Sequence, residues 1–381
     1  MNVQTKIVEW FKRNSFPLLA FLISRLGLFL LVYVSLIVLP MRTSEGLWRA
    51  FPQNLFLDGW SRWDSGWYIN IAQYGYSDTV HNVYLNTAFF PFYPLLIKGL
   101  SYLVGNVHIA GLLISNASLL AASLLLYRLV SEKFDTEIAQ KSLLLLLVNP
   151  FSFFFSAVYT ESLFLLLVTL VFFFGSSKKW LPAALCAAAA GATRLVGILT
   201  VIPLLYFYFE SIEFKWRRIH ADILWLGTSL LGLGGFILFQ ALKFGDPFLF
   251  VKSQNAPGWK EGVNLLSALD ALRISFSGDA LKTGEFPAVY LIHILAFLVG
   301  LSILIVTRRK IHPAWWIWAL VTLLVSFSVW ISVGRFLIVI FPLYVGTALL
   351  FKGKRFDGVL YISILFLSLF TILFSHWYWV G

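Results

Sequence analysis

The chain is expected to be an all-α protein that crosses a membrane many times. Of its 381 residues, 59% are hydrophobic and only 12% are charged, with a mean hydropathy of +0.83, which is far more apolar than a soluble domain. Apolar runs such as 16–39 and 221–242 reach the length of about 20 residues that a helix needs to cross hydrocarbon. Unbroken runs such as 143–148 lack the alternation of a membrane β-strand, so helices are predicted.

Eleven membrane spans are predicted from the apolar runs. They are 16–39, 108–130, 141–157, 160–175, 180–193, 195–210, 221–243, 287–306, 313–332, 336–351 and 357–379. Lys and Arg in short loops stay on the cytoplasmic side. With the N-terminus inside, five basic loops fall on that side: 128–133, 178–179, 215–218, 308–310 and 352–355. Segment 89–104 must then lie in the interface or re-enter, because a full span there would turn several basic loops outward.

Residues 1–381 are interpreted as a single membrane domain with two long outer loops. These loops are about 40–107 and 244–286, and three short turns join them on the outer side, at 159–161, 193–194 and 334–335. Some of the spans beside these turns are short, and breaks near 149–150 and 191–194 are expected to line a cavity.

Among the ionisable side chains of this outer face, four are singled out: Asp64, Glu161, Arg194 and Arg335. Charged residues near membrane depth are costly unless partnered, so they are candidates for function. Taken alone, Arg194 or Arg335 is equally well explained as an anchor in lipid headgroups. The convergence of all four on one face favours a site.

Other classes of site find little support. The formal charge of +11 does not indicate nucleic-acid binding, because Lys and Arg are scattered between apolar runs. The single cysteine, Cys186, excludes an intramolecular disulfide. The six histidines show no paired spacing, so no metal ion and no cofactor are expected, although Asp64 and Glu161 could share a divalent ion. Glycines 227, 232, 234 and 235 lie in an apolar helix and indicate close helix packing.

Five motifs along the chain resemble those of the PIG-V-like mannosyltransferases, relatives of GPI mannosyltransferase 2. They are Trp63-Asp64-Ser65-Gly66-Trp67-Tyr68 with 71–76 and 90–94, then 149–164, 192–197, 245–254 and 334–343. The resemblance covers about residues 20–345. It implies a GT-C glycosyltransferase bundle of about 11 transmembrane helices, with interfacial helices in the first outer loop, that transfers a sugar from a polyprenyl-phosphate donor on the non-cytoplasmic face. The acid of that loop is the expected general base, and the matching position is Asp64.

The expected reaction is one displacement at the anomeric carbon with inversion. Asp64 would accept the proton of the acceptor hydroxyl, and Arg194 and Arg335 would hold the lipid phosphate, since a guanidinium suits phosphate oxygens. The other predicted substrate contacts are Arg62, Trp63, Trp67, Tyr68, Tyr159, Glu161, Asp246 and Gln254. Most Trp and Tyr residues are typical of an interfacial belt, whereas those flanking Asp64 would face a sugar. Asp246 before Pro247 is equally typical of a turn.

The expected partners are a lipid-linked sugar donor and membrane lipids, and the resemblance implies that the sugar is mannose. The acceptor could be a glycolipid, a glycan or a protein. The expected location is a prokaryotic plasma membrane, or the endoplasmic reticulum of a eukaryote, with the site on the outer face. A transporter or flippase for a lipid-linked sugar is the competing hypothesis, and a non-catalytic scaffold subunit is a third. The absence of a repeated half and the position of the Asp64 motif in an outer loop favour the enzyme.

Overall fold

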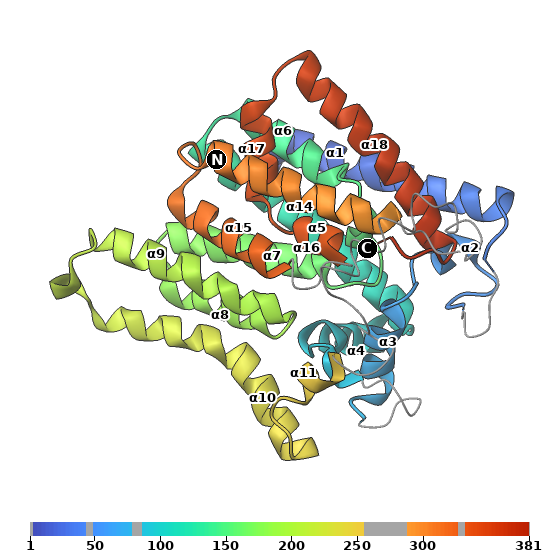
Figure 1. Ribbon diagram of the computed structural model, residues 1–381, viewed down its shortest axis with the longest axis horizontal. Helices are drawn as coiled ribbons and strands as arrows, with labels where there is room; N and C mark the ends of the chain where they lie inside the picture. Colours follow the sequence, from blue (N-terminus) through green and yellow to red (C-terminus); the bar gives the residue numbers. More distant parts are fainter. Residues whose placement is uncertain (1–2, 43–48, 78–85, 255–287, 327–331, 381) are drawn as a thin grey trace.

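The computed structural model describes residues 3–42, 49–77, 86–254, 288–326 and 332–380 (Figure 1). Throughout these ranges every regular element is a helix. The prediction of an all-α membrane protein is therefore confirmed. The part of the second outer loop at 255–286 lies outside the described residues.

Four helical segments are long and apolar enough to cross a membrane, namely Val8–Val38, Val107–Lys133, Ala221–Phe244 and Lys354–Ser375. They correspond to most of α1 (Val3–Val38), to α5 (Val107–Lys133), to η5 (Ala221–Leu230) continued by α10 (Leu231–Phe244), and to α18 (Lys354–Ser375). The total of eleven spans stays a prediction, because the other apolar helices are shorter.

The shorter helices fill the space between these long ones and form the outer loops. They are α2 (Leu55–Asp58), α3 (Ser65–Tyr74), η1 (Asn86–Ala88), α4 (Phe92–Val104), α6 (Thr136–Leu147), η2 (Ser152–Phe155), α7 (Glu161–Ser176), α8 (Trp180–Gly191), η3 (Leu195–Thr200), α9 (Val201–Ser211), η4 (Trp216–Arg218), α11 (Leu249–Gln254), α14 (Ala288–Thr307), α15 (Pro313–Ser326), α16 (Val333–Leu337) and α17 (Pro342–Leu350). The first outer loop thus contains several short helices, as predicted.

Two predicted spans are not continuous helices. The helix expected over 141–157 ends at Leu147, because the side chain of Asn149 accepts the N–H of Phe151 at 2.9 Å and forms a turn around Pro150. The helix expected over 336–351 is interrupted after Leu337 and begins again at Pro342. Proline is favourable in the first turn of a helix but not in its interior, so a new helix starts there. Both breaks lie beside the outer-face turns, so they shape the site. Residues 327–331 of the span predicted at 313–332 are outside the described residues.

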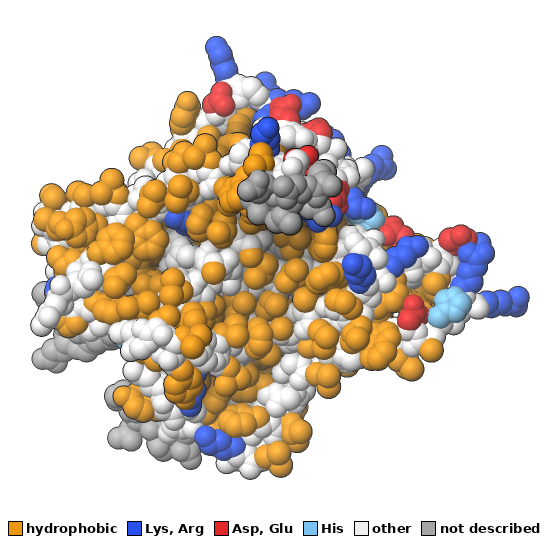
Figure 2. Space-filling view, turned by 180° about the vertical axis from the view of Figure 1, so that it is seen from behind, with side chains coloured by type: hydrophobic (Ala, Val, Ile, Leu, Met, Phe, Trp, Pro, Cys, Tyr) orange, Lys and Arg blue, Asp and Glu red, His pale blue; other side chains and the backbone are white. Residues whose placement is uncertain are grey.

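The helices are arranged with α7 between α5 and α8, while α8 also packs on η5 (Figure 1). In Figure 1 the turn after α9 lies at the far left and the turn after α17 at the top, whereas α2 lies at the right and α3, α4 and α11 lie below and to the right of the centre. The predicted basic loops 215–218 and 352–355 thus lie away from the helices of the predicted first outer loop. Figure 2 shows a broad hydrophobic face with charged side chains collected along its upper and right edges, as expected for a protein surrounded by lipid.

Only one of the four glycines predicted to pack closely does so. A Cβ added at Gly232 would overlap the backbone carbonyl of Ala188 in α8, whereas a Cβ at Gly227, Gly234 or Gly235 would meet nothing within 4 Å. The prediction was therefore wrong for these three, which face open surface. Gly232 lets η5 and α10 approach the end of α8, just before the turn that carries Arg194.

We expect Gly232→Ala to destabilise the protein by about 1–3 kcal/mol, the usual cost of forcing an extra carbon into a packed interface. Gly235→Ala is the matched control on the same helix. It adds a methyl group in open space and should be neutral or stabilising by up to ~1 kcal/mol. Thermal unfolding of the purified variants in detergent measures both. Equal unfolding temperatures for the two variants would contradict the packing.

Candidate active site

The turn that carries Asp64 is held by contacts of its backbone. The hydroxyl of Tyr159 accepts the N–H of Asp64 at 3.2 Å and donates to the carbonyl of Arg62 at 3.1 Å. Trp63 adopts a positive φ of 52°, and its indole packs edge-on against Trp377 and Trp379, each at a centroid distance of 5.6 Å. Asp64 precedes α3, but its carboxylate makes no capping hydrogen bond to that helix. The carboxylate is thus available for tertiary contacts.

Arg62 was predicted to contact substrate, but the structure places it inside the protein. Its Nη2 bonds Oδ2 of Asp58 at 2.6 Å, and its Nε donates to the carbonyl of Ser375 at 3.0 Å. Its guanidinium also lies over the ring of Trp377 at 4.9 Å. Burial lowers the pKa of Arg62, and the neighbouring Asp58 opposes this effect. These contacts join α2, the Asp64 turn and the end of α18, which is a structural role.

One continuous row of ion pairs joins the four charged residues that were singled out on the outer face, Asp64, Glu161, Arg194 and Arg335. Arg335 donates from Nη1 to Oδ2 of Asp64 at 2.6 Å and from Nε to Oε1 of Glu161 at 2.9 Å. The same Oε1 of Glu161 accepts from Nη1 of Arg194 at 2.6 Å. The order is therefore Asp64, Arg335, Glu161, Arg194, with alternating sign and a formal sum of zero.

The row is buried more deeply at its centre than at the Asp64 end. The side chain of Glu161 is 0% exposed, those of Arg335 and Arg194 are 8% and 9% exposed, and that of Asp64 is 23% exposed. Buried charges of this kind require partners, because each isolated charge would lose its hydration without compensation. Glu161 is the first residue of α7, where the helix dipole favours a carboxylate.

Aromatic rings enclose the two arginines. The guanidinium of Arg335 lies over Tyr159 at 4.7 Å and over Phe154 at 5.2 Å. That of Arg194 lies over Phe336 at 4.6 Å. Such contacts are attractive because the ring face is negative, and they exclude water from the ion pairs. Tyr159 thus packs against Arg335 and is not among the residues that line the cavity described next.

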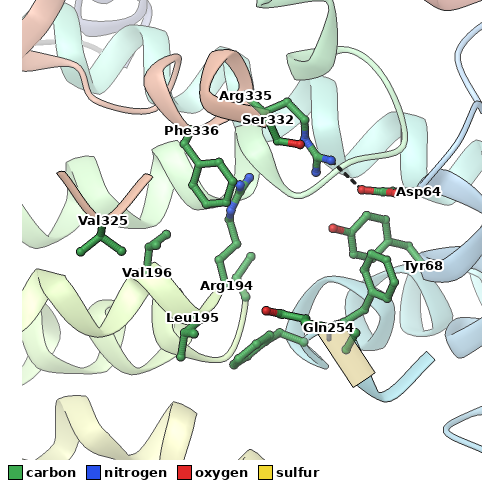
Figure 3. Close-up of a pocket in the computed structure, with 14 residues that line it drawn as sticks. Asp64, Tyr68, Arg194, Leu195, Val196, Gln254, Val325, Ser332, Arg335 and Phe336 are labelled. Atoms are coloured by element: carbon green, nitrogen blue, oxygen red, sulfur yellow. Dashed lines mark hydrogen bonds and ion pairs between the residues drawn. The ribbon is translucent and has the colours of Figure 1, made fainter. Parts of the chain in front are cut away.

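A cavity of about 270 Å³ opens in front of the row (Figure 3). Five of the predicted site residues line it: Asp64, Tyr68, Arg194, Gln254 and Arg335. The other lining residues are Ala88, Phe89, Phe90, Thr193, Leu195, Val196, Val325, Ser332 and Phe336. The cavity therefore combines segments from the first outer loop, from the turn before η3, from α11, from the end of α15 and from α16.

The two ends of the cavity differ in chemistry. In Figure 3, Asp64 and Tyr68 lie at one end, Leu195, Val196 and Val325 lie at the other, and Arg194 lies between them. One end thus offers a carboxylate and a phenol, and the other offers only aliphatic side chains. An amphipathic ligand with a polar head, a charge near its middle and an apolar tail matches this order.

The predicted aromatic residues have different surroundings. Burial raises the pKa of Tyr68 to about 12, so its hydroxyl stays protonated at neutral pH and can donate a hydrogen bond into the cavity. Trp67 stacks on Phe89 at a centroid distance of 5.8 Å and is not among the cavity residues. Trp63 likewise faces the C-terminal tryptophans. Tyr68 is therefore the predicted aromatic residue that is placed to meet a ligand.

The second outer loop contributes Gln254 to the cavity but not Asp246. Gln240 in α10 donates to the carbonyl of Thr87 at 3.0 Å and accepts the N–H of Phe250 at 2.9 Å, which fixes α11 against the first outer loop. Asp246 accepts the N–H of Phe248 at 3.0 Å and pairs with a lysine, whose hydrogen bond lowers the pKa of Asp246. These contacts are typical of a turn residue, and Asp246 does not line the cavity.

Arg25, a supporting residue in α1, was missed by sequence reasoning. Its buried guanidinium donates to the carbonyl of Leu147 at 2.6 Å and to the carbonyl of Ser152 at 3.0 Å. These bonds fix the start of the irregular segment 148–160 that leads to Tyr159 and Glu161. The available signal was a lone arginine within an apolar span, which by itself suggests a polar contact but does not identify the partner.

The carboxylates do not gather into a metal site. Over the ranges that are described, no group of three or more His, Cys, Asp and Glu side chains is close enough to hold a metal ion. Asp64 and Glu161, which could have shared a divalent ion, both accept hydrogen bonds from Arg335 instead.

Comparisons with known proteins give one family match and several structural similarities. The sequence model of the family described as dolichyl-phosphate-mannose-protein mannosyltransferase matches residues 88–239, which include Glu161 and Arg194. A search of the curated proteins found no match for the chain.

The similar solved structures include three of an oligosaccharyltransferase from Archaeoglobus fulgidus. The form tethered to an acceptor peptide is 15% identical, with a TM-score of 0.49 over 97% of this chain and 56% of that one. The apo form is 13% identical, with a TM-score of 0.45 over 98% and 57%. The complex with an inhibitory peptide and a dolichol-phosphate is 14% identical, with a TM-score of 0.44 over 96% and 56%. The chain spans only about half the length of these proteins.

Proposed function

We propose that the protein is a membrane glycosyltransferase that moves a sugar, most simply mannose, from a polyprenyl-phosphate donor to an acceptor hydroxyl on the non-cytoplasmic face. The observation that carries this proposal is that Asp64 and Arg194 line the same cavity. The family match at 88–239 supports it, because that family is described by the donor dolichyl-phosphate-mannose, which is a polyprenyl-phosphate sugar.

The proposed reaction is a single displacement. The acceptor oxygen attacks the anomeric carbon from the face opposite to the phosphate, the bond between that carbon and the phosphate oxygen breaks, and polyprenyl phosphate leaves. Asp64 takes the proton of the acceptor hydroxyl as general base. The guanidinium charge beside the cavity stabilises the phosphate as it gains negative charge. The configuration at the anomeric carbon is therefore inverted.

The other predicted contacts are assigned to the polar end of the cavity. The phenol of Tyr68 would donate to a sugar hydroxyl, and Gln254 would offer an amide to the sugar or the acceptor. Glu161 would act indirectly, since both of its arginine partners lie between it and the cavity. The acceptor would be a glycolipid, a glycan or a protein that approaches from the outer surface.

Sugar transfer by the purified protein in detergent tests this function. A synthetic short-chain polyprenyl phosphate carrying radiolabelled mannose is the donor, and the same lipid carrying glucose is the comparison. Release of polyprenyl phosphate reports donor cleavage whichever acceptor is used, and total membrane lipid extract supplies acceptors. A transporter would yield no product in detergent, where no compartments exist. The absence of donor cleavage with both sugars would overturn the proposal.

We expect the same assay to be insensitive to chelators. The phosphodiester of such a donor carries one negative charge, and an arginine is sufficient to neutralise it. Activity should therefore change by less than about twofold in the presence of EDTA, because no step uses a divalent ion. Loss of activity with EDTA and recovery with Mn²⁺ or Mg²⁺ would contradict this expectation.

A further inference from the structure

The members of the charged row differ in how many partners they have. Arg335 uses Nε for Glu161 and Nη1 for Asp64, and Glu161 accepts from both arginines through Oε1. Each residue at the two ends of the row is bonded through a single polar atom of its side chain. Arg194 donates from Nη1 alone, to Glu161 and, at 3.4 Å, to Thr160. Asp64 receives its one side-chain hydrogen bond through Oδ2.

The free positions of the two end residues face a possible substrate, and so does Nη2 of Arg335, which has no hydrogen-bond partner among the described residues although Arg335 lines the cavity. Nε and Nη2 of Arg194 have no partner among the described residues, and neither does Oδ1 of Asp64. Arg335 is less available, because its guanidinium is in contact with Tyr159, Phe154 and Trp379 at 4.7, 5.2 and 5.9 Å. Arg194 thus offers two free N–H positions and Arg335 offers only Nη2. Any turn of Arg335 toward a phosphate would break at least one of its two buried ion pairs, which is costly.

The position of Arg194 also suits an anion that is attached to a lipid. It lies between the polar end of the cavity and the aliphatic end formed by Leu195, Val196 and Val325 (Figure 3). Its guanidinium is packed on Phe336, so its edge is held in a fixed direction. Arg335 lies beside Asp64, where the sugar and the acceptor would have to meet.

We propose, on the basis of the function proposed above, that the two arginines have separate tasks. Arg194 alone binds the donor phosphate. Arg335 is a positioning residue, which holds Asp64 through Oδ2 so that Oδ1 faces the acceptor hydroxyl. The donor then lies with its sugar near Asp64 and Tyr68, its phosphate at Arg194 and the first isoprene units over Leu195, Val196 and Val325.

The matched variants Arg194→Gln and Arg335→Gln separate the two tasks. Loss of a charged hydrogen bond to phosphate should raise the donor KM of Arg194→Gln by about 10- to 100-fold. Arg335→Gln should leave the donor KM within about threefold and lower kcat by about 10- to 100-fold, the cost of a misoriented catalytic group.

Binding of a short-chain polyprenyl phosphate, measured by calorimetry, provides a readout that needs no turnover. Only Arg194→Gln should weaken it, by about the same 10- to 100-fold. Arg335→Lys is the alternative if Arg335→Gln does not fold, and it should restore part of kcat, because the ammonium group can still bond Oδ2 of Asp64. Weakened phosphate binding in both Arg335 variants would overturn the separate tasks even if the enzyme transfers sugar. Absence of transfer by the wild type would instead overturn the proposed function.

Discussion

Asp64→Asn is expected to lower the rate of sugar transfer by about 10²- to 10⁴-fold, the usual contribution of a positioned general base. The amide has nearly the same shape as the carboxylate, and its oxygen can still accept the hydrogen bond that Arg335 donates at 2.6 Å. It cannot take a proton from the acceptor hydroxyl. The backbone contact with Tyr159 is unaffected, so folding and phosphate binding should persist while kcat falls.

Asp246→Asn is the matched control for this substitution. Asp246 is an acid in the second outer loop that lies outside the cavity and bonds Lys252 at 2.5 Å. Its amide variant should transfer sugar within about twofold of wild type, because exposed ion pairs contribute little. If Asp64→Asn were as active as Asp246→Asn at saturating donor and acceptor, Asp64 would not be the base.

The helical architecture could be predicted because lipid leaves the backbone few alternatives. The runs predicted at 108–130 and 221–243 lie within α5 and within η5 followed by α10. The ends of other helices could not be predicted from hydropathy alone, and the break near 149–150 was expected only from Asn149 and Pro150. Leu147 ends α6 because the side chain of Asn149 forms a local turn, and the apolar residues after it pack in the core as irregular backbone. Hydropathy measures only how favourably a residue transfers into an apolar environment. Irregular backbone is tolerated at membrane depth when protein surrounds it, so an apolar run does not show where its helix ends.

The meeting of Asp64 and Arg335, which are 271 residues apart in the sequence, could be anticipated from sidedness alone. Counting the predicted spans places both residues on the same membrane face. Few positions near that face can hold a charged side chain, so the two residues are expected to lie close together. The pairing within the site could not be anticipated, because it depends on distances of a few ångströms. Sequence reasoning gave both arginines the same task, whereas their contacts differ in number and direction.

The supporting residues form the part of the site that sequence reasoning did not reach. Gln240 and Arg25 are buried polar residues in apolar helices, and their partners are mainly backbone groups of distant segments. Every segment of a chain offers backbone carbonyls and amides, so no sequence pattern indicates which one is bonded. Only the folded positions of Thr87, Leu147 and Ser152 reveal that these two side chains hold the irregular segments around the cavity.

The largest effect on stability is expected for Glu161→Ala. Glu161 is fully buried and accepts hydrogen bonds from both Arg194 and Arg335 through one oxygen. Removing its carboxylate leaves Arg194 without a carboxylate partner and leaves Arg335 with Asp64 alone. The loss should be about 3–5 kcal/mol, the usual cost of breaking a buried ion pair on one side. Reversible unfolding of the purified protein in mixed micelles, followed by circular dichroism, measures it.

A double-variant cycle distinguishes lost charge compensation from lost packing. In Glu161→Ala with Arg194→Met, one uncompensated cation is gone, so the double variant should be less destabilised than the sum of the two single variants by at least ~1 kcal/mol. Glu161→Gln should lie between wild type and Glu161→Ala, because the amide oxygen still accepts a hydrogen bond but carries no charge. Additive effects in the cycle would mean that Glu161 stabilises the fold by filling space and not by holding the two arginines.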